Sequence, residues 1–372
     1  MKKKLFLLFC VFLPFIFCKP QIGNEITILY LLPFHLDVEM SSPGSLKYAG
    51  EIHQIRQFEM MGFWLGAKMA LQEYEYMDKT INVIVRDAVR DAKVLNKILK
   101  DTALMENINI IIGPFYGSLF PVAADFAKEH NIIIVNPFST RFDFVENNPY
   151  VYKLTPPFAT RPETIAKVFL SQPNEYNIIL WVDSIPTPDM QAYKSYFKEH
   201  RIPFKEMHTL TLPENITNKN LIIALFDEPE RVIYSVYMLT NNDPESNVQN
   251  IVIVPAKWLS IPELKEDFFN LPQLYYFTNY FVGENSSAVK QFQSDYTFNY
   301  GAPAELAAYS YQGYDITRYF IDLYFIDSNT ENVPFQPLSY KFQWRRIPNG
   351  GFENIKPRFI QVRNLELEEL EE

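Results

Sequence analysis

The chain has 372 residues, 48% of them hydrophobic, which is enough for two domains with cores of their own. Its 34 basic and 44 acidic residues give a formal net charge of −10, whereas a nucleic-acid-binding surface needs a basic footprint. The composition therefore argues against nucleic acid as a partner, and the acidic excess is ordinary for a protein that stays in solution.

The N-terminus has the pattern of a secretory signal peptide. Three lysines follow Met1, and an apolar run at Leu5–Cys18 precedes Lys19 and Pro20. A run of about 14 apolar residues is shorter than the roughly 20 that span a bilayer. We therefore expect residues 1–18 to be a signal peptide and the mature chain to be secreted across the inner membrane into the periplasm.

Both cysteines of the chain, Cys10 and Cys18, lie in this segment. The mature domain is thus expected to have no disulfide, and a domain of this size needs none. An alternative is that Cys18 is the acylated first residue of a lipoprotein, which would tether the protein to the membrane. The residues before it, Phe15–Phe17, match the Leu-x-small-Cys pattern of bacterial lipoproteins poorly.

Buried strands alternate with helical patterns from residue 24 onward, which predicts β-α-β units and a parallel sheet. On the first helix, Gly62 and Gly66 lie at a spacing where small residues permit close packing on a sheet. The first half is expected to hold strands at Glu25–Leu32, Ile81–Arg86, Ile108–Ile112 and Ile132–Val135, and helices at 57–76, 91–106 and between the last two strands.

A second set of units begins near Pro156. Thr160 and Glu163 have the spacing of a capping box, in which the threonine hydroxyl accepts from the N–H of Glu163. Residues 365–372 are expected to form a solvated acidic tail. Between these points the pattern predicts strands or extended runs at Tyr176–Val182, Phe204–Leu212, Arg231–Leu239, Asn250–Val254, Leu274–Val282, Tyr340–Arg346 and Arg358–Val362, and helices at Asp189–Arg201, Ser287–Tyr300 and Pro303–Phe325.

The strand ending at Ile112 and its neighbour both run into loops rich in small and hydroxyl residues. Ligands bind beyond the carboxyl ends of the strands of a parallel sheet. Gly117 and Ser118 precede a helix whose first N–H groups could hold an anion such as a carboxylate. Ser139 and Thr140 offer hydroxyl groups from the neighbouring loop. The alternative is that these residues only cap helices.

No set of residues typical of catalysis is found. The five histidines show neither HExxH nor a repeated ligand spacing, and the mature chain has no thiolate ligands beyond Cys18. The GxSxG, P-loop and GxGxxG patterns are also absent from the sequence. We therefore expect neither an enzyme nor a metal or cofactor site.

Several segments resemble a known family. The stretch IIGPFYGSLFPVAADFAKEHNIIIVNPFST (Ile111–Thr140), followed by NPYVYKLTPP (Asn148–Pro157), is similar to type I periplasmic binding proteins, the class that includes branched-chain amino acid receptors of ABC transporters. Ala304–Phe325 resembles the helix that returns to the first lobe. Leu29–Asp37, Val254–Leu264 and Asn349–Val362 resemble a Bacteroidetes-type branch whose members often carry a LysM peptidoglycan-binding module.

The resemblance implies two Rossmann-like α/β lobes, each with a parallel central sheet, joined by three crossings of the chain around a ligand. Lobe 1 is expected to comprise 24–152 with 285–326, and lobe 2 to comprise 153–284 with 327–364. The crossings are then expected at Tyr150–Pro157, Tyr275–Val282 and about Phe325–Ser339.

Carried over by motif, Tyr116, Gly117 and Ser118 match the first ligand loop of the family, and Ser139 and Thr140 match the second. In amino acid binders these loops hold the carboxylate and ammonium groups of the ligand. Tyr116 could stack on the ligand or cover it.

The second lobe departs from the amino acid receptors. Asp183–Pro188 stands where those proteins have a Tyr-Gly pair after a strand. The short polar segment Thr240–Gln249, after the expected strand Arg231–Leu239, stands where they have a full helix. These departures put the second-lobe half of an amino acid site in doubt.

Two hypotheses remain open. One is an extracytoplasmic solute-binding protein, serving an ABC transporter, that clamps a small polar ligand between its lobes. The other is a cell-envelope scaffold or regulator with the same fold and no small ligand, analogous to lipoprotein activators of penicillin-binding proteins. The aromatic content of 16%, with 23 Tyr and 31 Phe, favours the second because aromatic residues are enriched at interfaces. An open polar cleft would favour the first.

Overall fold

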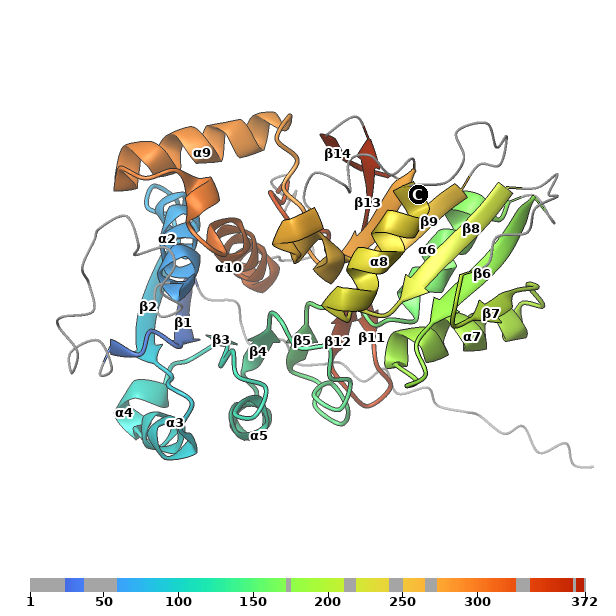
Figure 1. The fold of residues 1–372 in the computed structure, drawn as a ribbon. Coiled ribbons are helices and arrows are strands. Elements are labelled where there is room, and N and C mark those ends of the chain that lie inside the picture. Colours follow the sequence, from blue (N-terminus) through green and yellow to red (C-terminus); the bar gives the residue numbers. More distant parts are fainter. Residues whose placement is uncertain are drawn as a thin grey trace, which may run out of the picture.

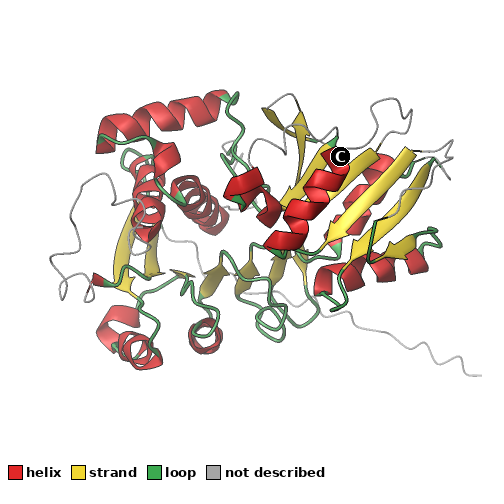
Figure 2. Cartoon of the chain, in the orientation of Figure 1, coloured by secondary structure: helices red, strands yellow, loops and turns green. Residues whose placement is uncertain are grey.

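The computed structural model describes residues 24–36, 59–171, 175–210, 219–240, 250–264, 273–325, 335–363 and 366–370. The predictions for residues 1–18, including Cys18, lie outside this part of the chain. The described residues form two α/β lobes side by side, each built on a seven-stranded sheet (Figure 1, Figure 2). In this part of the chain no helix is both long enough and apolar enough to cross a bilayer.

The first lobe is built around β1, whose seven residues after Glu25 are all buried. Such a continuous apolar run is typical of a parallel strand that is covered on both faces. Among the described strands of this sheet, only β11 and β12 pair antiparallel. The sheet order is β11 (Trp344–Arg346), β12 (Phe352–Asn354), β5 (Val151–Lys153), β4 (Ile133–Asn136), β3 (Ile110–Ile112), β1 (Glu25–Leu32) and β2 (Thr80–Asp87).

Two layers of helices cover the faces of this sheet. Alternate residues of β1 belong to different cores: Ile28 packs with one set of helices and Leu29 with the other. This alternation follows from the two-residue period of a strand. One face carries α2 (Glu59–Gln72) and α10 (Ser310–Phe325), with η6 (Ala304–Leu306) and α9 (Ser287–Tyr300) outside them, and the other carries α3 (Ala92–Leu99), α4 (Thr102–Met105) and α5 (Phe120–His130).

Helices α2 and α10 approach each other closely at three glycines. A Cβ atom added to Gly62, Gly66 or Gly313 would lie 2.2, 1.8 or 1.9 Å from a backbone oxygen of the facing segment. The prediction that Gly62 and Gly66 pack on a sheet is therefore wrong, because their neighbour is the chain at the start of α10. The close contact ties the returning helix to the first lobe.

The second lobe repeats this plan. Helices α6 (Thr160–Phe169) and α7 (Pro188–Glu199) cover one face, and α8 (Pro229–Thr240) covers the other with η3 (Ala256–Ser260) and η4 (Pro262–Leu264). Of the strand pairs in the described part of this lobe, only β10–β13 and β13–β14 are antiparallel. The sheet order is β14 (Glu366–Glu369), β13 (Arg358–Arg363), β10 (Leu274–Thr278), β9 (Asn250–Pro255), β8 (Lys219–Leu225), β6 (Tyr176–Val182) and β7 (Lys205–Met207).

Two elements of the second lobe differ from the sequence prediction. The expected strand Arg231–Leu239 is helix α8, and the strand before it, β8, was not predicted. The second lobe therefore has a strand followed by a three-turn helix. The sequence predicts a strand in place of this helix, followed only by a short polar segment. Residues 241–249 lie outside the described part.

The third crossing between the lobes lies later in the chain than expected. Strand β12 pairs parallel with β5, so residues 344–354 belong to the first sheet rather than to lobe 2. The chain then enters the second sheet at Arg358, and the crossing is 355–357 instead of 325–339. The chain leaves the first sheet after β5 and leaves the second sheet after β10.

The acidic C-terminus is not a free tail. Residues Glu366–Glu369 form β14, which pairs antiparallel with β13. Glu369 accepts a hydrogen bond from Arg358 at 2.7 Å and pairs with Lys341 at 2.9 Å. The expectation of a solvated tail is therefore wrong for these residues.

Candidate ligand-binding site

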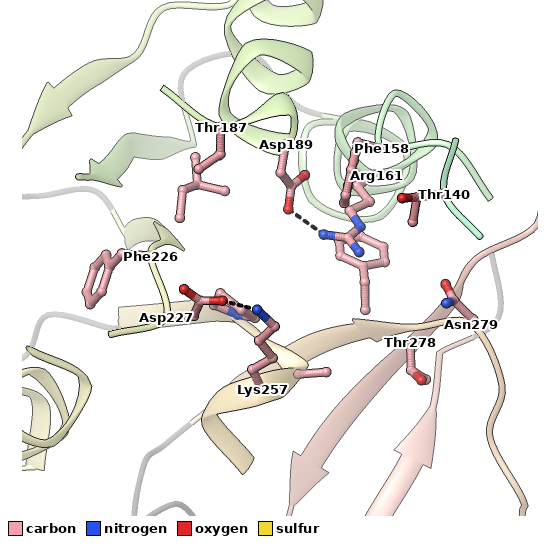
Figure 3. A pocket seen from close by; sticks show the side chains of 14 residues that line it. Thr140, Phe158, Arg161, Thr187, Asp189, Phe226, Asp227, Lys257, Thr278 and Asn279 are labelled. Atoms are coloured by element: carbon pink, nitrogen blue, oxygen red, sulfur yellow. Dashed lines mark hydrogen bonds and ion pairs between the residues drawn. The ribbon is translucent and has the colours of Figure 1, made fainter. Parts of the chain in front are cut away.

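A cavity of about 420 Å³ lies at the carboxyl edge of the second sheet (Figure 3). This is the edge at which parallel α/β sheets bind ligands. It is formed where β8, β9 and β10 end and where α6 and α7 begin. The residues lining it are Thr140, Phe158, Arg161, Thr187, Asp189, Leu225, Phe226, Asp227, Pro255, Ala256, Lys257, Phe277, Thr278 and Asn279.

An ion pair between Arg161 and Asp189 joins the starts of two helices in the cavity wall (Figure 3). Both side chains are about one-fifth exposed, at 23% and 18%. The guanidinium lies 4.8 Å from the ring centroid of Phe158 and 5.7 Å from that of Phe277. Attraction to these aromatic faces adds to the ion pair in holding the guanidinium in place.

The start of α6 is not the capping box that the sequence predicts. The N-cap position is Ala159, without a side-chain hydrogen bond, and the Thr160 hydroxyl donates to the Pro157 carbonyl at 2.8 Å. Glu163 pairs with Lys167 instead. The helix still begins where the motif placed it, and this puts Arg161 in its first turn facing the cavity.

Asp189 is positioned by the cap of α7. Thr187 is the N-cap residue, and its hydroxyl accepts from the N–H of Met190 at 3.2 Å. Asp189 thus lies in the first turn, where the helix dipole favours a negative charge. Burial raises the pKa of the Asp189 carboxyl, and Arg161 opposes that rise. One carboxylate oxygen, Oδ1, is buried and has no hydrogen-bond partner in the described residues.

A second ion pair, Lys257 with Asp227, projects into the cavity from the ends of β9 and β8 (Figure 3). The Lys257 side chain is 79% exposed, so this pair is far more hydrated than the first. Behind it, Arg231 of α8 stacks 3.8 Å from the ring centroid of Phe226 and pairs with Asp183 at 3.2 Å. Arg231 therefore supports the wall of the cavity.

Of the five residues that the family motif suggested, only Thr140 lines this cavity. Ser139 and Gly117 take part in the structure of the two loops. The Ser139 hydroxyl accepts from the N–H of Arg141 at 3.1 Å, and the Gly117 carbonyl accepts from the Arg141 side chain at 3.4 Å. Ser118 is exposed, and it is not the cap of α5, because Leu119 holds that position.

Backbone N–H groups near the start of α5, where an anion site is predicted, have partners within the protein. The N–H groups of Leu119 and Phe120 both donate to the Tyr116 carbonyl, at 2.9 and 3.1 Å. The N–H of Val122 donates to Leu119 at 3.1 Å, and Pro121 has no N–H. These backbone donors are therefore engaged within the loop and the helix.

Tyr116 lies in a cluster at the carboxyl edge of the first sheet. Its hydroxyl is 2.6 Å from Nε2 of His35, which has a left-handed backbone at φ 54°. Asp87 holds that backbone in place, since its carboxylate accepts the N–H groups of Phe34, His35 and Leu36. Tyr116 is thus held by the residues that follow the first two strands.

The charged residues of the cavity were not among the predicted site residues. Asp227 and Lys257 each lie two residues beyond the end of a strand, which is a signal that the sequence contains. Asp227 was missed because β8 itself was missed. The sequence places Arg161 and Asp189 only at helix starts, and their pairing depends on the contact of α6 with α7.

Comparison with known proteins gives the fold and no family membership. No family model matches the chain, and no curated protein matches it significantly. Solved structures do match over almost the whole chain. They include a putative branched-chain amino acid ABC transporter from Rhodospirillum rubrum, with 13% identity and a TM-score of 0.60, covering 93% of this chain and 100% of that one.

Two further structures show the range of proteins with this fold. One is an ABC transporter substrate-binding protein from Desulfitobacterium hafniense in complex with Leu, with 15% identity, a TM-score of 0.53 and coverage of 93% and 100%. The other is the C-domain of LpoA from Haemophilus influenzae, described as a regulator of PBP1A, with 14% identity, a TM-score of 0.53 and the same coverage. The chain therefore has the two-lobed fold of type I periplasmic binding proteins, which confirms the predicted fold class.

Proposed function

We propose that this chain is a solute-binding protein that clamps a small polar ligand between its two lobes. The observation that carries the proposal is the cavity at the carboxyl edge of the second sheet, with two ion pairs in its walls and Thr140 reaching it from the first lobe. A few polar groups among apolar walls are typical of small-molecule sites.

One of the two second-lobe departures from amino acid receptors no longer weighs against this proposal. Strand β8 and helix α8 supply the strand–helix unit that the short segment Thr240–Gln249 seemed to replace. The cavity is open and carries four charged side chains, so it is not plugged by its three phenylalanines. An open cleft with charged side chains favours a binding protein over a scaffold.

The proposal includes the finer expectations from the sequence. The chain is secreted to the periplasm by its signal peptide and acts with an ABC transporter, without catalysing a reaction. It belongs to the Bacteroidetes-type branch suggested by Leu29–Asp37, Val254–Leu264 and Asn349–Val362. Whether Cys18 anchors it to the membrane is tested by mass spectrometry of the mature protein, which distinguishes an acylated N-terminus from a free one.

A thermal-shift screen of the purified chain against amino acids, peptides, nucleosides and sugars tests the binding function. A ligand present at about 100 times its dissociation constant should add about 2.7 kcal/mol of stability. Arg161→Met should abolish the shift, because it removes the cation held between the two aromatic rings. A wild-type protein that shifts with no compound in the screen would contradict the proposal.

Lys219→Met is a matched control for the cavity variants. Lys219 begins β8 and pairs with Glu175 at 3.0 Å, so it lies at the opposite end of the strand that leads to Asp227. This variant also removes one cation from an ion pair of the second lobe. It should keep the full ligand-induced shift.

An alternative function as an envelope scaffold is favoured by one surface feature. Helix α8 presents Ile233, Tyr234, Tyr237 and Met238 on one outer face, and its two tyrosines are 61% and 64% exposed. Aromatic residues and methionine gathered in this way are typical of protein interfaces. The face lies outside the cavity, so a partner bound there would not compete with a ligand.

Affinity purification from an envelope extract tests the alternative. A specific partner should be retained by the wild-type chain and lost with Tyr234→Ser. Tyr76→Ser is the control, because Tyr76 is 96% exposed but lies on the first lobe. Equal recovery of the partner with all three proteins would exclude the α8 face as the interface.

A further inference from the structure

The two carboxylate oxygens of Asp189 differ, and the difference indicates what the cavity binds. Oδ2 pairs with Arg161, whereas Oδ1 is buried without a hydrogen-bond partner in the part of the chain that the structure describes. A buried acceptor without a donor is costly, so a ligand that supplies a donor gains this interaction when the partly exposed carboxylate turns toward it. The strongest donor for a carboxylate is a charged N–H group.

The second ion pair is suited to an anionic group. Lys257 carries a compact charge on a flexible stem, and its side chain is mostly exposed. Its ammonium group can therefore turn from Asp227 toward a ligand without leaving a charge buried. Figure 3 shows that Lys257 projects from a different part of the wall than Arg161 and Asp189.

We infer that the cavity takes a short peptide with free ends, whose terminal ammonium meets Asp189 and whose terminal carboxylate meets Lys257. This inference rests on the proposed function. The two cations and two anions of the wall sum to zero, which matches a net-neutral zwitterion. A free amino acid carries both charges on one carbon atom, whereas a peptide carries them at opposite ends and can reach both ion pairs.

The size and the apolar walls of the cavity support a peptide. A volume of about 420 Å³ falls within the range of about 300–1,000 Å³ that holds drug-sized ligands. Pro255, Ala256 and Phe277 line the same cavity and offer apolar surface to the side chains of such a peptide. The amide of Asn279 and the hydroxyl of Thr140 add polar groups for its backbone.

Calorimetric titration with a panel of apolar dipeptides such as Leu-Leu, their N-acetyl and C-amide forms, and the free amino acids tests this inference. The dipeptides with free ends should bind at least tenfold more tightly than each of the other forms. Asp189→Asn should lower the affinity for free dipeptides and remove the discrimination against N-acetyl forms. Lys257→Met should lower the affinity for free dipeptides and remove the discrimination against C-amide forms. Lys219→Met should change neither the affinity nor the discrimination.

The outcomes separate this inference from the proposed function. Equal affinity for free and N-acetyl dipeptides, or tighter binding of free amino acids, overturns the inference and leaves a solute-binding protein. Binding of a sugar or a nucleoside in place of a peptide would likewise overturn the inference and leave a solute-binding protein. Failure of every class of compound to bind overturns both. Urea unfolding of Asp189→Asn and Lys257→Met serves as a folding control. If their midpoints equal that of the wild type, misfolding is excluded as the cause of lost binding.

Discussion

The hinge, meaning the three crossings and the strand ends that lead into them, contains charged side chains, and so does the cavity. The two sets differ in how far they are exposed to water. At the hinge, Lys153 of β5 and Glu353 of β12 form an ion pair at 3.0 Å with both side chains fully buried. Glu353 is also bound by Arg345 at 2.7 Å. In the cavity, the Lys257 side chain is largely hydrated, and those of Arg161 and Asp189 are about one-fifth exposed.

The difference teaches which charges hold the fold and which are left for a ligand. A fully buried pair whose groups meet each other has no capacity for another partner, and removing one member leaves a buried charge. A hydrated pair can exchange its partner at little cost, because water already shares its charges. The hinge pair is therefore closed to other partners, whereas Lys257 and Asp227 are accessible to one.

The hinge network extends to all three crossings. Asp315 of α10 accepts hydrogen bonds from the N–H groups of Leu338, Ser339 and Tyr340. The Ser339 carbonyl then accepts from the Phe281 N–H at 2.9 Å and from the Arg358 side chain at 2.8 Å. One short segment thus connects the first lobe to the second and third crossings, while Lys153 and Glu353 join the ends of β5 and β12, which lead into the first and third crossings.

The largest expected effect is that of Lys153→Met. Removing the ammonium leaves Glu353 buried with Arg345 as its remaining charged partner, and breaking a buried pair costs about 3–5 kcal/mol. Urea unfolding followed by circular dichroism measures this loss. The double variant Lys153→Met/Glu353→Leu should recover at least about 2 kcal/mol, because it leaves no unpaired buried charge. A single variant as stable as the wild type would show that the pair is not structural.

The second expected effect is a pH dependence due to Asp315. Burial raises the pKa of this carboxyl from 3.8 to about 6, although four hydrogen bonds to it oppose the rise. Between these pH values the folded state keeps a proton that the unfolded state has released, so the free energy of unfolding falls as the pH rises. The fall amounts to about 3 kcal/mol and is complete above about pH 6.

Comparison with Asp315→Asn isolates this contribution. The variant should be less stable than the wild type throughout, because its amide group faces N–H donors that the carboxylate accepts. It should also lack the proton exchange, so the difference in free energy of unfolding between the two proteins should narrow by about 2 kcal/mol from pH 4 to pH 7. Urea titrations at four pH values measure it, and a constant difference would contradict the raised pKa.

Glu369→Gln should have a smaller effect on stability. The variant keeps one acceptor for Arg358 but loses the negative charge opposite two cations, Arg358 and Lys341. Hydrogen bonds to charged groups contribute about 1.5–3 kcal/mol, so we expect a loss of about 1.5 kcal/mol in urea unfolding. Glu366→Gln is the control, because that side chain is exposed on the same strand. An equal loss in both variants would assign the effect to strand β14 rather than to the ion pairs.

Most of the fold could be predicted from local patterns, because parallel strands have continuous apolar runs. Glu25–Leu32 and Tyr176–Val182 are strands as expected, and Ser287–Tyr300 is a helix as expected. Helix α8 was misread because Val, Ile and Tyr favour strands, and only packing reveals the period of its buried residues Val232 and Val236. Pairing of β12 with β5 is a contact between distant segments that no local pattern shows.

The candidate site could be predicted only in its general place. The sequence indicated the carboxyl edges of parallel strands, and the cavity lies at such an edge, with Thr140 in it. The family motif pointed to the first lobe, where the backbone donors after Tyr116 are engaged in the loop. The charged groups of the second lobe come from separate loops, and their pairing follows from how α6, α7 and the strand ends meet in space.

The smallest effect on stability is expected for Lys257→Met, which gives the sharpest contrast with Lys153→Met. The same substitution removes the same charge from an ion pair, but the Lys257 side chain is 79% exposed and its partner Asp227 is 45% exposed. Exposed pairs contribute little, so the free energy of unfolding should change by no more than about 0.5 kcal/mol. Urea unfolding of both variants under one set of conditions measures the contrast. A loss as large as that of Lys153→Met would mean that the cavity pair is structural too, and the cavity would then have fewer charges to offer a ligand.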